Sequence, residues 1–192
     1  MTQVDKMYGD IRRTEIIYQT ALFIALFAIG SYIVIPMVPV PVTLQTLFIL
    51  LCGCVMKRHA AIPAVLYIIL GTLGLPLFHQ MTSGPGILMG PTGGYMFGFI
   101  LAALIVGIAC ERKSKTIKIA GLILGSAAIT ICGVIWISAS TGLSIGDALL
   151  IGAAPFVIGD ILKIAAAYLI SERIKSTDEE DSADESTNEG TD

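Results

Sequence analysis

Charged residues are scarce in this chain of 192 residues. Only 14% of the residues are Asp, Glu, Lys or Arg, 55% are apolar, and the mean hydropathy is +0.82. Soluble domains carry about 25% charged residues, so this composition excludes an ordinary soluble enzyme or nucleic-acid-binding domain. The sequence therefore predicts an integral membrane protein with a single domain.

Residue types that hold metals or nucleotides are also few. The two histidines and four cysteines are not spaced like a metal set, and the cysteines lie in apolar runs, where thiols behave as small hydrophobes. No lysine lies between Arg58 and Lys113, so the glycine-rich stretch in that interval lacks the Gly-Lys-Ser/Thr ending of a phosphate loop. We expect no catalytic residue, no metal and no cofactor in this chain.

What the sequence does have is a series of long uncharged runs. We interpret them as six transmembrane helices in a compact all-α bundle, although the second and third are short for a bilayer core that takes about 17 to 25 residues. The charged start followed by about twenty apolar residues reads as a first span rather than a cleavable signal peptide. The predicted spans are Ile16–Ile35, Thr43–Met56, Ala60–Leu75, Thr92–Cys110, Ile119–Ile137 and Pro155–Ser171.

The basic residues predict the orientation and the domain limits. Eleven of the twelve Lys and Arg residues lie before the first span, in alternate connections or directly after the last span, which indicates cytoplasmic N- and C-termini. We expect a cytoplasmic segment over residues 1–15 and a membrane domain over 16–175. Residues 176–192 hold eight acidic and no basic residues, which is typical of a disordered tail.

The twelfth basic residue, Lys163, lies inside the last apolar run together with Asp160. Residues three apart share a helix face, and each charge near mid-membrane costs about 2.5 to 3.5 kcal/mol on insertion scales. A structural ion pair between helices is one explanation. We favour a binding site for a polar solute, because intramembrane ionisable residues commonly mark such sites.

The connection after the first span has three prolines between residues 36 and 41, which favour a rigid extended segment. Thr43 is then expected to cap the second helix, and Gln45 to lie within its first turn with both donors and an acceptor. A capped helix start with a solvated amide is the plainer alternative. In the favoured interpretation, both side chains contribute to the site.

The stretch Ser83–Tyr95 contains five glycines and two prolines. Glycine lets backbone N–H groups approach a ligand closely at a helix start, so Gly84, Gly90, Gly93 and Gly94 are candidate binding residues. Gly94 and Gly98 also form a Gly-x-x-x-Gly pair, for which helix packing is the plainer alternative.

Aromatic side chains near the predicted outer surface complete the candidate site. Tyr95 follows the glycines, and Phe156 follows Pro155 at the expected start of the sixth helix. The only tryptophan, Trp136, lies near the outer end of the fifth helix, where membership of an interfacial aromatic belt and contact with a ligand are both open. Thr43, Thr92 and Pro155 are each expected to start a helix on the outer side, above Lys163. The positive ends of these three helices, together with the lysine, favour an organic anion as the ligand.

Four motifs in this order carry a specific resemblance. The segments are Pro39–Gln45, Leu73–Pro76, Gly90–Tyr95 and Pro155–Lys163, and the match extends over about Ile16 to Ser171. Together they resemble the BioY family, the biotin-specific substrate-binding (S) components of energy-coupling-factor (ECF) transporters. The acidic tail is not part of that pattern.

The resemblance implies uptake of biotin across a prokaryotic cell membrane. Lys163 would pair with the biotin carboxylate and Asp160 would orient either the lysine or the ligand. Thr43, Gln45 and the glycine backbone would bind the ureido ring, and Tyr95 and Phe156 would form the wall. Partner ATPase subunits would use ATP, and the pair Ala21 and Ala25 on the first helix would meet the membrane coupling protein.

Two other classes of function were weighed. An intramembrane enzyme would need a base paired with a nucleophile, or a metal cluster, beside Asp160, and the spans offer neither. A secondary transporter of a small organic anion, working alone through protonation of Asp160, is the stronger alternative, although the chain shows no obvious inverted repeat. Uptake without ATPase partners, with and without a protonophore, separates the two transport mechanisms.

Overall fold

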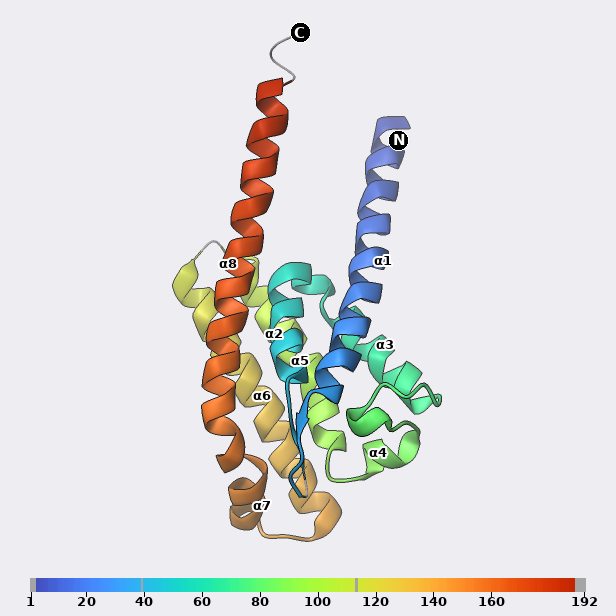
Figure 1. The fold of residues 1–192 in the computed structure, drawn as a ribbon, viewed down its shortest axis with the longest axis vertical. Helices are drawn as coiled ribbons and strands as arrows, with labels where there is room; N and C mark the ends of the chain where they lie inside the picture. Colours follow the sequence, from blue (N-terminus) through green and yellow to red (C-terminus); the bar gives the residue numbers. More distant parts are fainter. Residues whose placement is uncertain (1–2, 39, 113, 189–192) are drawn as a thin grey trace.

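The computed structural model describes residues 3–38, 40–112 and 114–188, with side chains described for 11–38, 40–112 and 114–177. Within these ranges the chain is helical apart from one small hairpin (Figure 1). The α-helices are α1 (Gln3–Tyr32), α2 (Gln45–Met56), α3 (Ala61–Thr72), α4 (Pro85–Met89), α5 (Gly93–Cys110), α6 (Lys115–Thr141), α7 (Ile145–Gly152) and α8 (Val157–Asn188). Three 3₁₀ turns, η1 (Lys57–His59), η2 (His79–Met81) and η3 (Ala154–Phe156), connect them.

Four helical segments of the described chain are long and apolar enough to cross a membrane, and they cover Ile11–Tyr32, Gly93–Cys110, Lys115–Thr141 and Ile145–Thr177. The second and third predicted spans are α2 and α3, of 12 residues each, which form one pair bent by 117°. A 12-residue helix is only about 18 Å long, so neither crosses a bilayer core of about 30 Å alone. The structure therefore supports four or five spans by length, fewer than the six expected.

A strained turn produces the bend. Lys57 has a φ of 53°, and its N–H donates to the carbonyl oxygen of Gly53. The Lys57 carbonyl lies against Gly107 of α5, where an added Cβ would be 2.2 Å from that oxygen. Gly107 therefore lets the turn pack directly on α5.

The proline-rich connection is extended, as expected. It forms an antiparallel hairpin in which β1 (Val34–Ile35) pairs with β2 (Val42–Thr43). Thr43 pairs with Val34 in this hairpin, and α2 begins at Gln45 after Leu44 with no side-chain cap. The prediction that Thr43 caps the second helix is therefore wrong, because strand pairing places it one residue too early.

Helices α5 and α6 pack closely through glycines. An added Cβ would lie 2.2 Å from Trp136 Cβ at Gly94 and 2.8 Å from Ile129 Cα at Gly98. Gly125 of α6 meets Val106 of α5 in the same way, at 2.6 Å. The packing interpretation of these glycines is confirmed.

The end of α6 leads into the short helix α7. In α7 the Ser144 hydroxyl accepts a hydrogen bond from the Asp147 N–H, which caps the helix start. Pro155 then lies in η3, so the following long helix begins at Val157 rather than at Pro155. α8 runs to Asn188 and so includes the first part of the acidic segment, where composition led us to expect disorder.

Both long terminal helices extend beyond the same end of the bundle: the start of α1 (blue) and the end of α8 (red) lie at one side in Figure 1. The exposed hydrophobic side chains on α1, α6 and α8 are suited to contact with lipid. The core between α1 and α3 includes the fully buried Phe27, Tyr67 and Phe78, whose rings meet edge to face.

Candidate functional site

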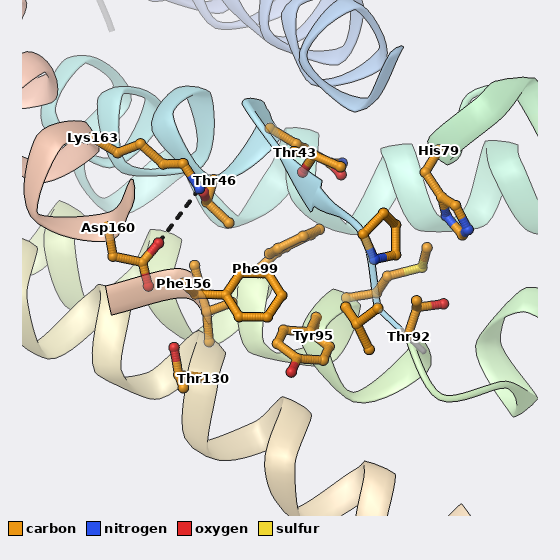
Figure 2. Close-up of a pocket in the computed structure, with 15 residues that line it drawn as sticks. Thr43, Thr46, His79, Thr92, Tyr95, Phe99, Thr130, Phe156, Asp160 and Lys163 are labelled. Atoms are coloured by element: carbon orange, nitrogen blue, oxygen red, sulfur yellow. Dashed lines mark hydrogen bonds and ion pairs between the residues drawn. The ribbon is translucent and has the colours of Figure 1, made fainter. Parts of the chain in front are cut away.

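A pocket lies at the end of the bundle opposite the two termini, between the hairpin segment and helices α2, α5, α6 and α8 (Figure 2). We call it the outer pocket. The space between its lining atoms, including the part open to solvent, is about 560 Å³. It is lined by Val40, Pro41, Thr43, Gln45, Thr46, His79, Thr92, Tyr95, Met96, Phe99, Ile129, Thr130, Phe156, Asp160 and Lys163.

The two charged residues that the sequence singled out are at one end of this pocket. Lys163 Nζ lies 3.4 Å from Asp160 Oδ1, and both side chains come from one face of α8. Their side chains are 9% and 19% exposed, respectively. An ion pair this far out of water carries a large desolvation penalty, so its position in a pocket favours a role in binding polar groups.

Two polar groups in the lining of the pocket have no hydrogen-bond partner among the described residues. Gln45 Nε2 and Thr46 Oγ1 are buried without a hydrogen bond in the described part of the chain. Leaving a buried donor or acceptor unpaired costs about 1–3 kcal/mol, and native structures rarely accept this without a reason. Because both residues line the pocket, a ligand with its own donors and acceptors would satisfy them.

Aromatic rings form the middle of the pocket. Tyr95 and Phe156 pack with ring centroids 5.9 Å apart, and Phe99 lies one turn along α5 from Tyr95. The Tyr95 hydroxyl donates to the Gly152 carbonyl oxygen at 2.6 Å. Its ring also rests on Gly133, where an added Cβ would be 2.3 Å away. The wall is therefore fixed in place and suits the apolar part of a small ligand.

His79 and Thr92 form the other end of the pocket, as Figure 2 shows. The connection that carries His79 is held firmly, because Tyr67 and Ser31 both donate hydrogen bonds to the Leu77 carbonyl oxygen, at 2.7 and 2.8 Å. Partial burial lowers the pKa of His79 below its ordinary value. The imidazole is thus neutral at physiological pH and offers one donor and one acceptor.

The structure brings six of the predicted binding residues together and separates five from them. Thr43, Gln45, Tyr95, Phe156, Asp160 and Lys163 line the pocket, whereas Gly84, Gly90, Gly93, Gly94 and Trp136 do not.

Four of these five residues, all except Gly84, make packing contacts or hydrogen bonds within the protein instead. Gly94 faces α6, and Gly93 faces the Leu88 carbonyl, 1.8 Å from where its Cβ would be. Trp136 Nε1 donates to the Gly90 carbonyl oxygen at 3.0 Å. Gly84 has a φ of 96° at the start of α4, with no atom near its missing Cβ.

Nine further lining residues were not among the predicted ones. Thr92, Met96 and Phe99 share a helix face with Tyr95, so helical spacing could have revealed them. Thr46 adjoins Gln45, and Val40 and Pro41 lie shortly before Thr43, while Ile129 and Thr130 carry no distinguishing signal. His79 comes from a separate connection, and nothing in its local sequence marks it as part of the site.

Sequence comparison bears directly on this site. A model of the BioY family matches residues 3–179. The chain belongs to the BioY family. It is 37% identical to the biotin transporter BioY of Thermotoga maritima over 84% of this chain and 96% of that protein. It is 35% identical to a probable biotin transporter BioY of Pyrococcus horikoshii, over 81% and 93% of the two chains.

A solved structure has the same fold. The S-component for biotin from an ECF-type ABC transporter superposes with a TM-score of 0.77, covering 92% of this chain and 95% of that one, at 21% identity. The fold of this BioY family member is therefore that of an S-component. The helical architecture and the candidate spans agree with a multi-pass membrane protein.

Proposed function

We propose that this protein binds biotin and captures it for uptake as the S component of an ECF-type ABC transporter. One observation carries the proposal: the Lys163–Asp160 pair lies at one end of an aromatic-walled pocket that is also lined by the unpaired Gln45 and Thr46. Family membership and the relatives named biotin transporters support the same ligand. The protein on this view is a carrier subunit and no enzyme.

The structure favours one orientation of biotin over the other. Biotin has a ureido ring at one end and a carboxylate at the other. Lys163 is already paired with Asp160, so a ligand carboxylate there would bring a second buried negative charge against one cation. A neutral ureido ring fits better, because its two N–H groups can donate to Asp160 and its carbonyl can accept from Lys163 or Gln45.

In this orientation the carboxylate lies toward Thr43, Thr92 and His79, nearer to solvent. The assignment differs from the expectation that Lys163 pairs with the carboxylate. The rest of the ligand, a thioether ring and an alkyl chain, would then pack on Tyr95, Phe156 and Phe99.

The test is a titration of the purified protein with biotin and two analogues. The methyl ester removes the carboxylate charge, and 2-iminobiotin replaces the ureido group with a guanidinium, which is cationic at neutral pH. We expect tight binding of biotin, a modest loss for the ester and a severe loss for iminobiotin beside Lys163. Absence of biotin binding would overturn the function. Normal binding of iminobiotin with loss of the ester would place the carboxylate at Lys163 instead.

We further propose that α2 and α3, each lengthened by the connection next to it, cross the membrane as two separate segments, which gives six crossings with both termini in the cytoplasm. The common end of α1 and α8 supports this, and so do the basic residues of η1 and of the α5–α6 connection near that end. The membrane is then the plasma membrane of a prokaryotic cell. Accessibility of single cysteines placed at position 74 and at position 112 to a membrane-impermeant reagent tests this topology.

The energy for uptake would come from partner subunits that hydrolyse ATP. The sequence has no nucleotide-binding motif, and α1 exposes Ala21 and Ala25 on its surface. Two small residues four apart let another helix approach closely, so this face is the proposed contact for the membrane coupling protein. Uptake that persists without any ATPase partner, and stops with a protonophore, would favour the stand-alone proton-coupled transporter.

A further inference from the structure

A second pocket lies at the end of the bundle that carries the termini, on the opposite side from the outer pocket. It is lined by Arg12, Ile16, Met56, Lys57, Arg58, His59 and Glu111, and we call it the inner pocket. The space between its lining atoms, including its open side, is about 1050 Å³. Nothing in the proposed capture of biotin uses it.

The charge of the inner pocket is strongly one-sided. Three cationic side chains face a single carboxylate, a net charge of +2 with His59 neutral. Glu111 is already engaged, because Arg58 Nε lies 2.6 Å from its Oε1 and Arg58 Nη2 lies 3.2 Å from its Oε2. Arg12 and Lys57 therefore remain as the two cations without a carboxylate partner among the described residues.

The position of these two cations comes from tertiary structure. Arg12 lies on α1, while Lys57 lies in the strained turn that ends α2, with its φ of 53° held by packing on Gly107. A lysine is rarely found at a positive φ, where glycine or asparagine is the usual residue. The turn thus brings Lys57 next to a helix that is 45 residues away in sequence.

The inner pocket also has an apolar part and lies near the ends of candidate membrane spans. Ile16 is half-buried and Met56 is 4% exposed, and both lie below the charged rim. The rim coincides with the last residues of α2 and α5, where candidate spans end. Next to Ile16, the side chain of Ile17 is 69% exposed on a helix that crosses the membrane.

We propose that the inner pocket binds the headgroup of an anionic phospholipid of the cytoplasmic leaflet. The lipid phosphate meets Arg12 and Lys57, and the start of its acyl chains covers Ile16 and Met56. A free phosphate ion offers the same charge, but it leaves the apolar part uncovered. The lipid is therefore the occupant that uses both halves of the pocket.

The test compares lipid binding by matched variants of the full chain in detergent. Arg12→Gln with Lys57→Gln removes the two proposed contacts. Arg13→Gln with Arg112→Gln removes two neighbouring exposed charges that do not line the pocket. Native mass spectrometry and the shift of the unfolding midpoint report binding of phosphatidylglycerol, phosphatidylcholine or inorganic phosphate, and biotin binding reports correct folding.

We expect phosphatidylglycerol to bind the parent protein and the control pair, and to bind the Arg12/Lys57 pair about twenty-five-fold more weakly, at about fivefold for each cation near an anionic surface. Phosphatidylcholine should bind poorly to all three. Equal loss in both pairs would overturn the site in favour of diffuse surface charge. Equal protection by inorganic phosphate would overturn the lipid and leave a soluble anion as the ligand.

Discussion

Lys163 and Asp160 form an ion pair of 3.4 Å that is internal to α8 and opens onto the outer pocket. Because both partners come from the same helix, the two opposite charges meet within α8. The helices around it supply the low-dielectric surroundings, and the pocket supplies access. Charge neutrality within the pair is what makes a neutral ureido ring its most suitable ligand group.

The first prediction concerns this pair. Lys163→Met and Asp160→Asn should each weaken biotin binding by about 2–5 kcal/mol, because each removes a contact and Lys163→Met leaves a buried charge alone. The double variant should regain thermal stability relative to Lys163→Met, since no unpaired charge remains, yet it should not regain binding. Calorimetric titration and unfolding curves of all three variants check this. Parental affinity in Lys163→Met would contradict it.

The second prediction concerns Gln45, whose Nε2 is buried without a hydrogen bond. Gln45→Met keeps the size of the side chain and removes the unpaired group. The unliganded protein should become more stable, by about 1 kcal/mol, while biotin binding weakens. Opposite signs in stability and affinity identify a group kept for the ligand. A variant that loses both would show Gln45 to be structural.

The third prediction revises the expected role of the glycines. Gly93→Ala and Gly94→Ala should lower stability, because the new methyl groups meet the Leu88 carbonyl and the Trp136 side chain. Gly86→Ala is the matched control, since no atom lies within 4 Å of its Cβ position. Unfolding midpoints of the three variants provide the measurement. A Gly93→Ala protein with unchanged stability and weak biotin binding would contradict this prediction and show that Gly93 contributes to ligand binding.

The fourth prediction is a pH dependence that arises from His79. Burial lowers the pKa of His79 in the folded protein, so the unfolded chain binds a proton first as the pH falls below about 6.5. Stability should therefore fall between pH 7 and pH 5. In His79→Gln this part of the decrease should be absent, as thermal unfolding across that range would reveal. The same dependence of stability on pH in both proteins would exclude His79 as its source.

The fifth prediction tests the proposed partner surface on α1. Ala21→Trp with Ala25→Trp should leave biotin binding intact and prevent co-purification with the coupling protein and its ATPases. Ile131→Trp with Ile135→Trp is the matched control, because these α6 residues are also four apart and are 57% and 61% exposed. Normal assembly of the alanine variant would exclude this face.

The sequence by itself determined the class of protein and the centre of its site. The composition predicts a membrane protein because a chain whose surface lies in lipid carries many apolar and few charged residues. Asp160 and Lys163 could be located because a charge in an apolar segment carries a desolvation penalty in any arrangement of the helices. Gln45, Tyr95 and Phe156 follow from their places at helix starts and in family motifs, which are local properties.

Only the tertiary structure decided what the glycines do and which distant residues join the pocket. The role of a glycine depends on the atom opposite its missing Cβ, and for Gly94 that atom belongs to Trp136 of another helix. His79 reaches the pocket because hydrogen bonds from α1 and α3 hold its connection in place. The bend at Lys57 likewise depends on packing against Gly107, a contact between residues that sequence periodicity cannot relate.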